Sequence, residues 1–299
     1  MQHLDEKIEA KGPNGPLVGR HMFSKTSTNK IVLIIPGSGP TDHNGNNPLG
    51  VSASTYKLLA AGLANKGIQS VRFDKRGMFA SKSAVPDAND VTISDYADDV
   101  VAWIDAIHAK VPNAEIWLLG HSEGGLVALV SAQRDIQLSG VIMVAAAGRK
   151  IGEILREQIL ANPANEPIVE DAMFAITQLE AGAHADVNDL HPAIQQLFSP
   201  SAQSYMIDWM SYDPAKEINS IELPILILQG DKDLQVKLMD ANRLSVSVPS
   251  AKLVIIPNVN HVLKEVNSDS TQQNAETYSN PDLPIASEVL QQVVKFIDP

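Results

Sequence analysis

The chain has 299 residues, of which 44% are hydrophobic and 19% charged, a size and composition that suit a large α/β domain with insertions. Its formal net charge of −12 argues against nucleic acid and membrane surfaces as partners, because phosphate groups are bound by clustered Lys and Arg. The absence of cysteine excludes a disulfide framework, a thiolate zinc site and a cysteine nucleophile.

The first segment of the chain shows no sign of a signal peptide. Residues 1–10 are charged and lack an apolar run followed by small residues. No apolar run in the chain approaches the ~20 residues of a membrane-spanning helix, so we expect a cytoplasmic protein. Lys7–Ala10, the turn Gly12–Gly15 and Leu17–Phe23 are typical of a β-hairpin, which we expect at a sheet edge.

Short, almost purely apolar runs recur along the chain and predict strands. Such runs, bounded by Gly or Pro, indicate strands that are buried on both faces of a parallel sheet. They are Ile31–Ile35, Ser70–Phe73, Ile116–Leu119, Val141–Ala146, Ile225–Leu228 and Leu253–Ile256. Helical patterns lie between them at Thr55–Lys66, Ile93–Ala109 and Gly124–Arg134. This alternation predicts an α/β fold with right-handed crossovers and an open, doubly wound sheet.

One segment interrupts the alternation of strands and helices. Residues 148–216 contain no strand-like run and carry helical patterns at Ile151–Leu160, Ile168–Leu179 and Ala202–Trp209. We interpret them as a helical insertion into a core formed by residues 1–147 and 217–299. After the last strand, the polar residues Asn267–Pro284 predict an ordered excursion over the surface, followed by an amphipathic helix at Ile285–Ile297.

A candidate nucleophile lies between a predicted strand and a predicted helix. The sequence Gly120-His121-Ser122-Glu123-Gly124 follows the run Ile116–Leu119 directly. The Gly-x-Ser-x-Gly spacing is typical of a nucleophile elbow, in which a strained turn exposes the serine hydroxyl at the end of the sheet. The backbone N–H of Glu123 would then face an oxyanion. The alternative is a tightly packed, glycine-rich turn without a catalytic role.

A serine nucleophile needs a base, and the base needs a group that orients it. Asp233 follows the run Ile225–Leu228 in a turn that can aim its side chain inward, with Asp231 as the second choice. His261 follows the last predicted strand, whereas His121 is expected to point elsewhere on its tight turn. The chain order Ser122, Asp233, His261 is the order in which this kind of fold carries a serine triad. For each acid the alternative is a loop cap or a solvated charge.

The loop after the first buried strand is a candidate oxyanion loop. Pro36–Asn46 follows Ile31–Ile35 and is rich in glycine, so its backbone can approach a bound carbonyl oxygen. We expect the N–H of Ser38, or alternatively that of Gly39, to be the second oxyanion donor beside the N–H of Glu123.

The same loop carries three oxygen-bearing side chains. Asp42, Asn44 and Asn46 have the spacing of metal ligands, but the Glu that would complete a calcium loop is missing. A hydrogen-bonded turn is therefore the preferred interpretation. We expect neither a metal nor an organic cofactor.

Four segments of the chain resemble the α/β-hydrolase superfamily, and in particular a bacterial esterase-like branch that is similar to serine aminopeptidases and lysophospholipase-like hydrolases. They are Pro36–Asp42, Arg72–Gly77, Gly120–Gly125 and Asn260–Lys264. The resemblance implies an eight-stranded, mostly parallel sheet and a helical cap at residues 148–216. Phe79 departs from the pattern, because glycine is common at that position, and it could narrow the acyl site or pack under the cap.

The function that we expect is hydrolysis of carboxylic esters with small to medium acyl chains, through an acyl intermediate on Ser122. The partner would be a small-molecule ester. The same triad would also suit an acyl-CoA thioesterase or a peptidase, and it would permit a haloperoxidase-like side activity. A non-catalytic binding protein on a hydrolase scaffold is the alternative from another class. A dehalogenase would need Asp in place of Ser122.

Overall fold

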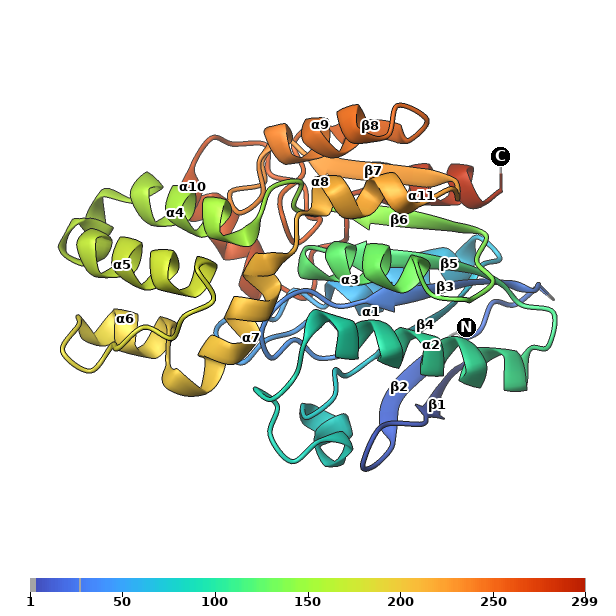
Figure 1. Ribbon diagram of the computed structural model, residues 1–299. Coiled ribbons are helices and arrows are strands. Elements are labelled where there is room, and N and C mark those ends of the chain that lie inside the picture. Colours follow the sequence, from blue (N-terminus) through green and yellow to red (C-terminus); the bar gives the residue numbers. More distant parts are fainter. Residues whose placement is uncertain (1–3, 27, 299) are drawn as a thin grey trace.

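The computed structural model describes residues 4–26 and 28–298. Residues 1–3, which belong to the segment 1–10 that was considered as a signal peptide, therefore lie outside the described residues. The centre of the fold is an eight-stranded sheet in the order β1-β2-β4-β3-β5-β6-β7-β8 (Figure 1). The strands are β1 Asp5–Ala10, β2 Leu17–Met22, β3 Lys30–Ile35, β4 Gln69–Phe73, β5 Glu115–His121, β6 Gly140–Val144, β7 Ile225–Gly230 and β8 Lys252–Ile256. β1 and β2 form an antiparallel hairpin, β2 is antiparallel to β4, and every other pair is parallel. The predicted α/β class, hairpin and mostly parallel sheet are confirmed.

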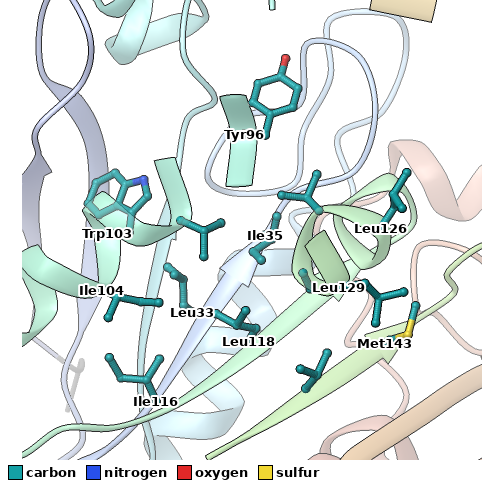
Figure 2. Close-up of a cluster of buried hydrophobic side chains, with 14 of the residues drawn as sticks. Leu33, Ile35, Tyr96, Trp103, Ile104, Ile116, Leu118, Leu126, Leu129 and Met143 are labelled. Carbon is teal, nitrogen blue, oxygen red and sulfur yellow. The ribbon is translucent and has the colours of Figure 1, made fainter. Parts of the chain in front are cut away.

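Helices cover both faces of the sheet, which explains why its central strands β3, β5, β6 and β7 are apolar without alternation. They are α1 Thr55–Asn65, α2 Ile93–Lys110, α3 Glu123–Ala132, α8 Pro214–Glu217, α9 Leu238–Ser247 and α11 Ser287–Ile297. Leu33, Leu118 and Met143 share one buried cluster with Trp103 of α2 and other side chains of α2 and α3 (Figure 2). The alternate strand residues join α1 and α11 in a second cluster on the opposite face.

The residues inserted between β6 and β7 form helices with a buried cluster of their own. These helices are α4 Ile151–Ala161, α5 Val169–Glu180, α6 Pro192–Leu197 and α7 Pro200–Ser211, with a 3-10 turn at Pro163–Ile168. They lie at the left of Figure 1, beyond one end of the sheet. Side chains from α4, α5, α6 and α7, including Ile176 and Ile194, are buried against one another. The helical patterns near α4, α5 and α7 are confirmed, whereas α6 was not expected.

The predicted polar excursion contains a short helix, α10 Thr271–Glu276, followed by a 3-10 turn at Thr277–Ser279. Its buried side chains are polar: Asn260 Nδ2 donates to Asn274 Oδ1 at 3.0 Å and to Thr277 Oγ1 at 2.7 Å. The segment is therefore fastened by hydrogen bonds to the loop that carries His261. Within residues 4–26 and 28–298, the helices are too short or too polar to cross a membrane.

Candidate active site

Ser122 occupies a strained turn between β5 and α3. Its φ of 57° and ψ of −122° lie in a region that a residue with a side chain rarely adopts. A Cβ on Gly120 would lie 2.1 Å from the carbonyl oxygen of Gly124, and a Cβ on Gly124 would lie 2.3 Å from the carbonyl oxygen of Ile35. Both glycines are thus required by close backbone contacts. The Ser122 N–H donates to the carbonyl oxygen of Val144 at 3.0 Å, which anchors the turn to β6.

Asp233 and His261 form a buried pair beyond the ends of β7 and β8. His261 Nδ1 donates to Asp233 Oδ2 at 2.8 Å. Asp233 Oδ1 accepts the backbone N–H groups of Gln235 and Val236 at 2.8 and 2.9 Å. Burial opposes the charge of Asp233, but the charge and hydrogen bond of His261 and the two N–H groups outweigh it and lower the pKa of this carboxyl.

Asp231, the second choice for the acid, lies elsewhere. It is exposed, and its carboxylate accepts the N–H of Asn258 at 2.6 Å. Sequence reasoning missed a further contact of the buried pair, because Gln229 Nε2 donates to Asp233 Oδ2 at 3.1 Å. The one sequence feature that pointed to this contact is that Gln229, a polar residue, directly follows the buried run Ile225–Leu228.

The expectation that His121 points away from the site is wrong. Its Nε2 lies 2.8 Å from the carbonyl oxygen of His261, and its Nδ1 lies 2.9 Å from the hydroxyl of Tyr56. A carbonyl only accepts, so Nε2 carries the hydrogen and Nδ1 accepts from Tyr56. Burial, followed by the charge of His261, lowers the pKa of His121 to about 3, so the ring remains neutral. The Tyr56 hydroxyl also accepts the N–H of Gly37 at 2.9 Å, which links this chain of hydrogen bonds to the candidate oxyanion loop.

The two candidate oxyanion donors lie close to Ser122, Glu123 as the next residue in the chain and Ser38 as a neighbour in space. Glu123 is the first residue of α3, and the N–H groups of a first helical turn have no acceptor within the helix. Ser38 follows Gly37, and a Cβ on Gly37 would lie 3.2 Å from the Cβ of Ser122. Ser38 and Ser122 line the same two cavities. Gly39, the alternative donor, is not among the described residues that line either cavity.

The loop beyond Gly39 is a hydrogen-bonded turn, as the sequence predicts. Asp42 Oδ1 accepts the N–H groups of Asn44 and Asn46, each at 2.8 Å. In the described part of the chain, no group of three or more His, Asp and Glu side chains is arranged to hold a metal ion.

Two cavities meet at Ser122. The first, called the polar cavity because most of its side chains carry polar atoms, has a volume of about 160 Å³, and its lining includes Ser38, Thr41, Asn47, Ser122, Gln235, His261 and Tyr278 together with Val51 and Val262. The second, called the apolar cavity, has a volume of about 260 Å³, and its lining includes Ser38, Ser122, Leu126, Ile154, Leu155, Met206 and Trp209. Ser122 is common to both, whereas His261 lines the polar cavity and not the apolar one.

Phe79 does not enter either cavity among the described residues, and its side chain is 42% exposed. Neither suggested role for it, in the acyl site or under the inserted helices, fits this position. Its φ of 45° lies in the left-handed region that favours glycine. Glycine would adopt this backbone conformation without strain, whereas Phe79 adopts it with a side chain.

The chain is similar to characterised hydrolases. A model of the serine aminopeptidase S33 family matches residues 49–265. Esterase EstD of Thermotoga maritima is 24% identical over 271 residues, which cover 88% of this chain and 62% of EstD. Phospholipase YtpA of Bacillus subtilis is 43% identical over 124 residues, which cover 41% of this chain and 43% of YtpA. The chain therefore spans less than two thirds of the length of each of these relatives.

Solved structures share the fold. Est1E of Butyrivibrio proteoclasticus matches with a TM-score of 0.59 and 20% identity, over 98% of this chain and 99% of that one. An esterase of Pyrococcus furiosus matches with a TM-score of 0.61 and 14% identity, over 99% of this chain and 90% of that one. The family model covers most of the chain, and the sheet order and neighbouring structures agree with it. The chain belongs to the serine aminopeptidase S33 family of α/β hydrolases.

Proposed function

We propose that this hydrolase is a serine carboxylesterase in which Ser122, His261 and Asp233 form the catalytic triad. The Ser122 Oγ attacks the ester carbonyl carbon while His261 Nε2 takes the hydroxyl proton. The tetrahedral intermediate collapses, the bond to the alcohol oxygen breaks, and His261 returns the proton to the leaving alcohol. Water then attacks the acyl–Ser122 ester by the same route in reverse, which releases the acid and restores the serine.

The backbone N–H groups of Ser38 and Glu123 would stabilise the negative oxygen of each tetrahedral intermediate. Their placement on a loop and at a helix N-terminus allows both to face the oxygen without reorganisation. Asp233 would hold His261 with Nδ1 protonated, which leaves Nε2 free to accept a proton. The 2.8 Å contact between Asp233 and His261 supports this role.

The strongest support for the proposal is that His261 lines the polar cavity and not the apolar cavity. The leaving alcohol must receive its proton from His261, so it belongs in the polar cavity, which His261 lines. The acyl chain then belongs in the apolar cavity, whose walls include Leu126, Ile154 and Trp209. This division favours esters of a polar alcohol with an apolar acyl group.

We also propose that residues 148–216 act as a cap over the acyl site. Ile154 and Leu155 of α4 and Met206 and Trp209 of α7 all lie in this segment and line the apolar cavity. Because these side chains come from two inserted helices, the packing of the cap would determine which acyl lengths fit.

The charges around the cavities favour an ester over the alternatives. An aminopeptidase needs a free carboxylate for the substrate ammonium, but among the described lining residues the only carboxylate is that of Glu123, which is paired with Lys75. A CoA thioesterase needs cations at its entrance, but Arg149 is engaged by Asp240 and Glu157 at 2.8 and 2.6 Å. The ammonium group of an aminopeptidase substrate would therefore find Glu123 already paired, and a CoA thioester would find Arg149 already paired.

Initial hydrolysis rates on p-nitrophenyl esters of increasing acyl length test the proposal. We expect turnover in the wild type and its loss in Ser122→Ala. Ser131→Ala is the matched control, because Ser131 lies in the same helix with its hydroxyl bonded to the carbonyl oxygen of Val127 at 2.7 Å. Equal rates in the wild type and Ser122→Ala, or no turnover on any ester, would contradict the proposal.

A further inference from the structure

A buried lysine outside the triad contacts both parts of the candidate oxyanion hole. Lys75 follows β4 and is 3% exposed. Its Nζ donates to the carbonyl oxygen of Gly37 at 2.9 Å and to Glu123 Oε1 at 3.2 Å. The same ammonium lies 5.1 Å from the centre of the Tyr96 ring. Glu123 is also buried.

The first of these contacts acts on a donor peptide. The carbonyl group of Gly37 and the N–H of Ser38 belong to one peptide unit, which is trans, so the two bonds point in opposite directions. A cation on the carbonyl oxygen therefore fixes the direction of the Ser38 N–H. It also draws electron density from the peptide, which strengthens that N–H as a donor.

The second contact reaches the other donor residue. Glu123 would supply the other oxyanion N–H from its backbone, and its carboxylate binds the ammonium of Lys75. One ammonium thus connects the loop after β3 to the N-terminus of α3. The Tyr56 hydroxyl accepts the N–H of Gly37, so the loop is held at both its N–H and its carbonyl group.

A role in stability alone does not account for this pair. Removing two charges from water carries a desolvation cost for each ion, and well-packed apolar residues of similar size are often as stable as a buried ion pair. Orienting an oxyanion donor would give the pair a role in catalysis, because the loss of one donor typically lowers kcat by about 10²–10³-fold.

We propose that Lys75 is a positioning residue that aligns the Ser38 N–H with the developing oxyanion and that Glu123 holds it there. This inference rests on the proposed esterase function. Lys75 itself touches neither the substrate nor the reacting atoms. Its effect should therefore appear in the stabilisation of the transition state and not in the binding of the ground state.

The test compares the wild type with Lys75→Met and with the double variant Lys75→Met/Glu123→Gln. The single variant leaves Glu123 as an unpaired buried charge, so its folding is at risk. The double variant removes both charges and is expected to fold with a melting temperature closer to that of the wild type. We expect its kcat to fall about 30-fold or more while KM changes about twofold or less. Glu123→Gln alone, which keeps an oxygen acceptor for Lys75, should lose less activity.

Affinity for a trifluoromethyl ketone provides a readout that a purely structural role would not move. The Ser122 Oγ adds to the ketone carbon, the carbonyl electron pair moves to the oxygen, and the proton passes to His261. We expect the folded double variant to bind the ketone more weakly in proportion to its loss of kcat. The corresponding secondary alcohol, which forms no adduct, should bind as it does to the wild type.

A folded double variant with wild-type kcat and ketone affinity would overturn the role of Lys75. A loss of affinity for the ketone and the alcohol alike would also overturn it, because that result indicates general damage to the site. A wild-type protein without esterase activity would contradict the proposed function itself, so the two failures are distinguishable.

Discussion

The ring of His121 supports the backbone of His261, because His121 Nε2 donates to the carbonyl oxygen of His261 at 2.8 Å. The residue before the candidate nucleophile thus holds the candidate base. The bond joins residues that are 140 positions apart in the sequence. The two rings are tilted by 49° with centres 4.8 Å apart, so the contact also includes ring packing.

Replacement of His121 by Phe should lower kcat while the protein stays folded. The variant keeps the ring volume but loses the hydrogen bonds to His261 and Tyr56, and a lost buried bond of about 1–2 kcal/mol corresponds to a rate loss of roughly tenfold. Steady-state kinetics on a p-nitrophenyl ester would measure it. His108→Phe is the control, because His108 lines neither cavity in the described part of the chain. Wild-type kcat in a folded His121→Phe protein would show that the support is unnecessary.

Acid should destabilise the protein partly through His21. This histidine is fully buried, its Nε2 contacts Gln69 Oε1 at 2.9 Å, and burial lowers its pKa from 6.5 to about 4. Between these two values the unfolded chain binds a proton that the folded chain does not, so the free energy of unfolding falls as the pH drops. Protonation of His21 in the unfolded chain should lower the free energy of unfolding by about 3 kcal/mol between pH 7 and pH 4.

Urea unfolding at several pH values would measure this effect. His21→Gln should show a shallower decline in unfolding free energy between pH 7 and pH 4 than the wild type. The exposed His184 provides the control, because His184→Gln removes a histidine without removing a buried one. If the unfolding free energy of His21→Gln fell as steeply with pH as that of the wild type, burial of His21 would not be a cause of acid sensitivity.

The apolar cavity should set acyl length. Leu155 of α4 lines this cavity, so Leu155→Trp should fill part of it and exclude long acyl chains. We expect kcat/KM to fall about tenfold or more for an octanoate ester and to change little for an acetate ester, as is typical of apolar pockets. Leu160→Trp on the same helix is the control, because Leu160 is 60% exposed. An equal loss of kcat/KM on both esters would show that the acyl chain does not bind in the apolar cavity.

Much of the fold could be predicted because its determinants are local. Strands buried on both faces need continuous apolar runs, and the run Ile31–Ile35 corresponds to β3 within one residue. The elbow was predictable because the contacts that exclude a Cβ at Gly120 and Gly124 leave a glycine signature. Asp233 could be preferred over Asp231 because its turn was readable from the residues that follow β7.

Other features could not be predicted because they depend on contacts between distant parts of the chain. The Tyr56–His121 bond spans 65 positions, and the bond from Lys75 to Gly37 spans 38. A pattern of single residue types does not show which side chains will meet at such separations. The helix α10 was missed because its stability comes from buried polar contacts such as that of Asn274, which leave no apolar periodicity.

The role of Ser122 as the nucleophile can be tested directly by locating the adduct that an alkyl fluorophosphonate forms with the protein. The serine oxygen would displace fluoride at phosphorus while His261 takes the hydroxyl proton, which gives a stable phosphonyl ester. We expect a single adduct by intact-protein mass, mapped to Ser122 by peptide sequencing, and no adduct in Ser122→Ala. An adduct on another residue, or undiminished labelling of Ser122→Ala, would show that Ser122 is not the nucleophile.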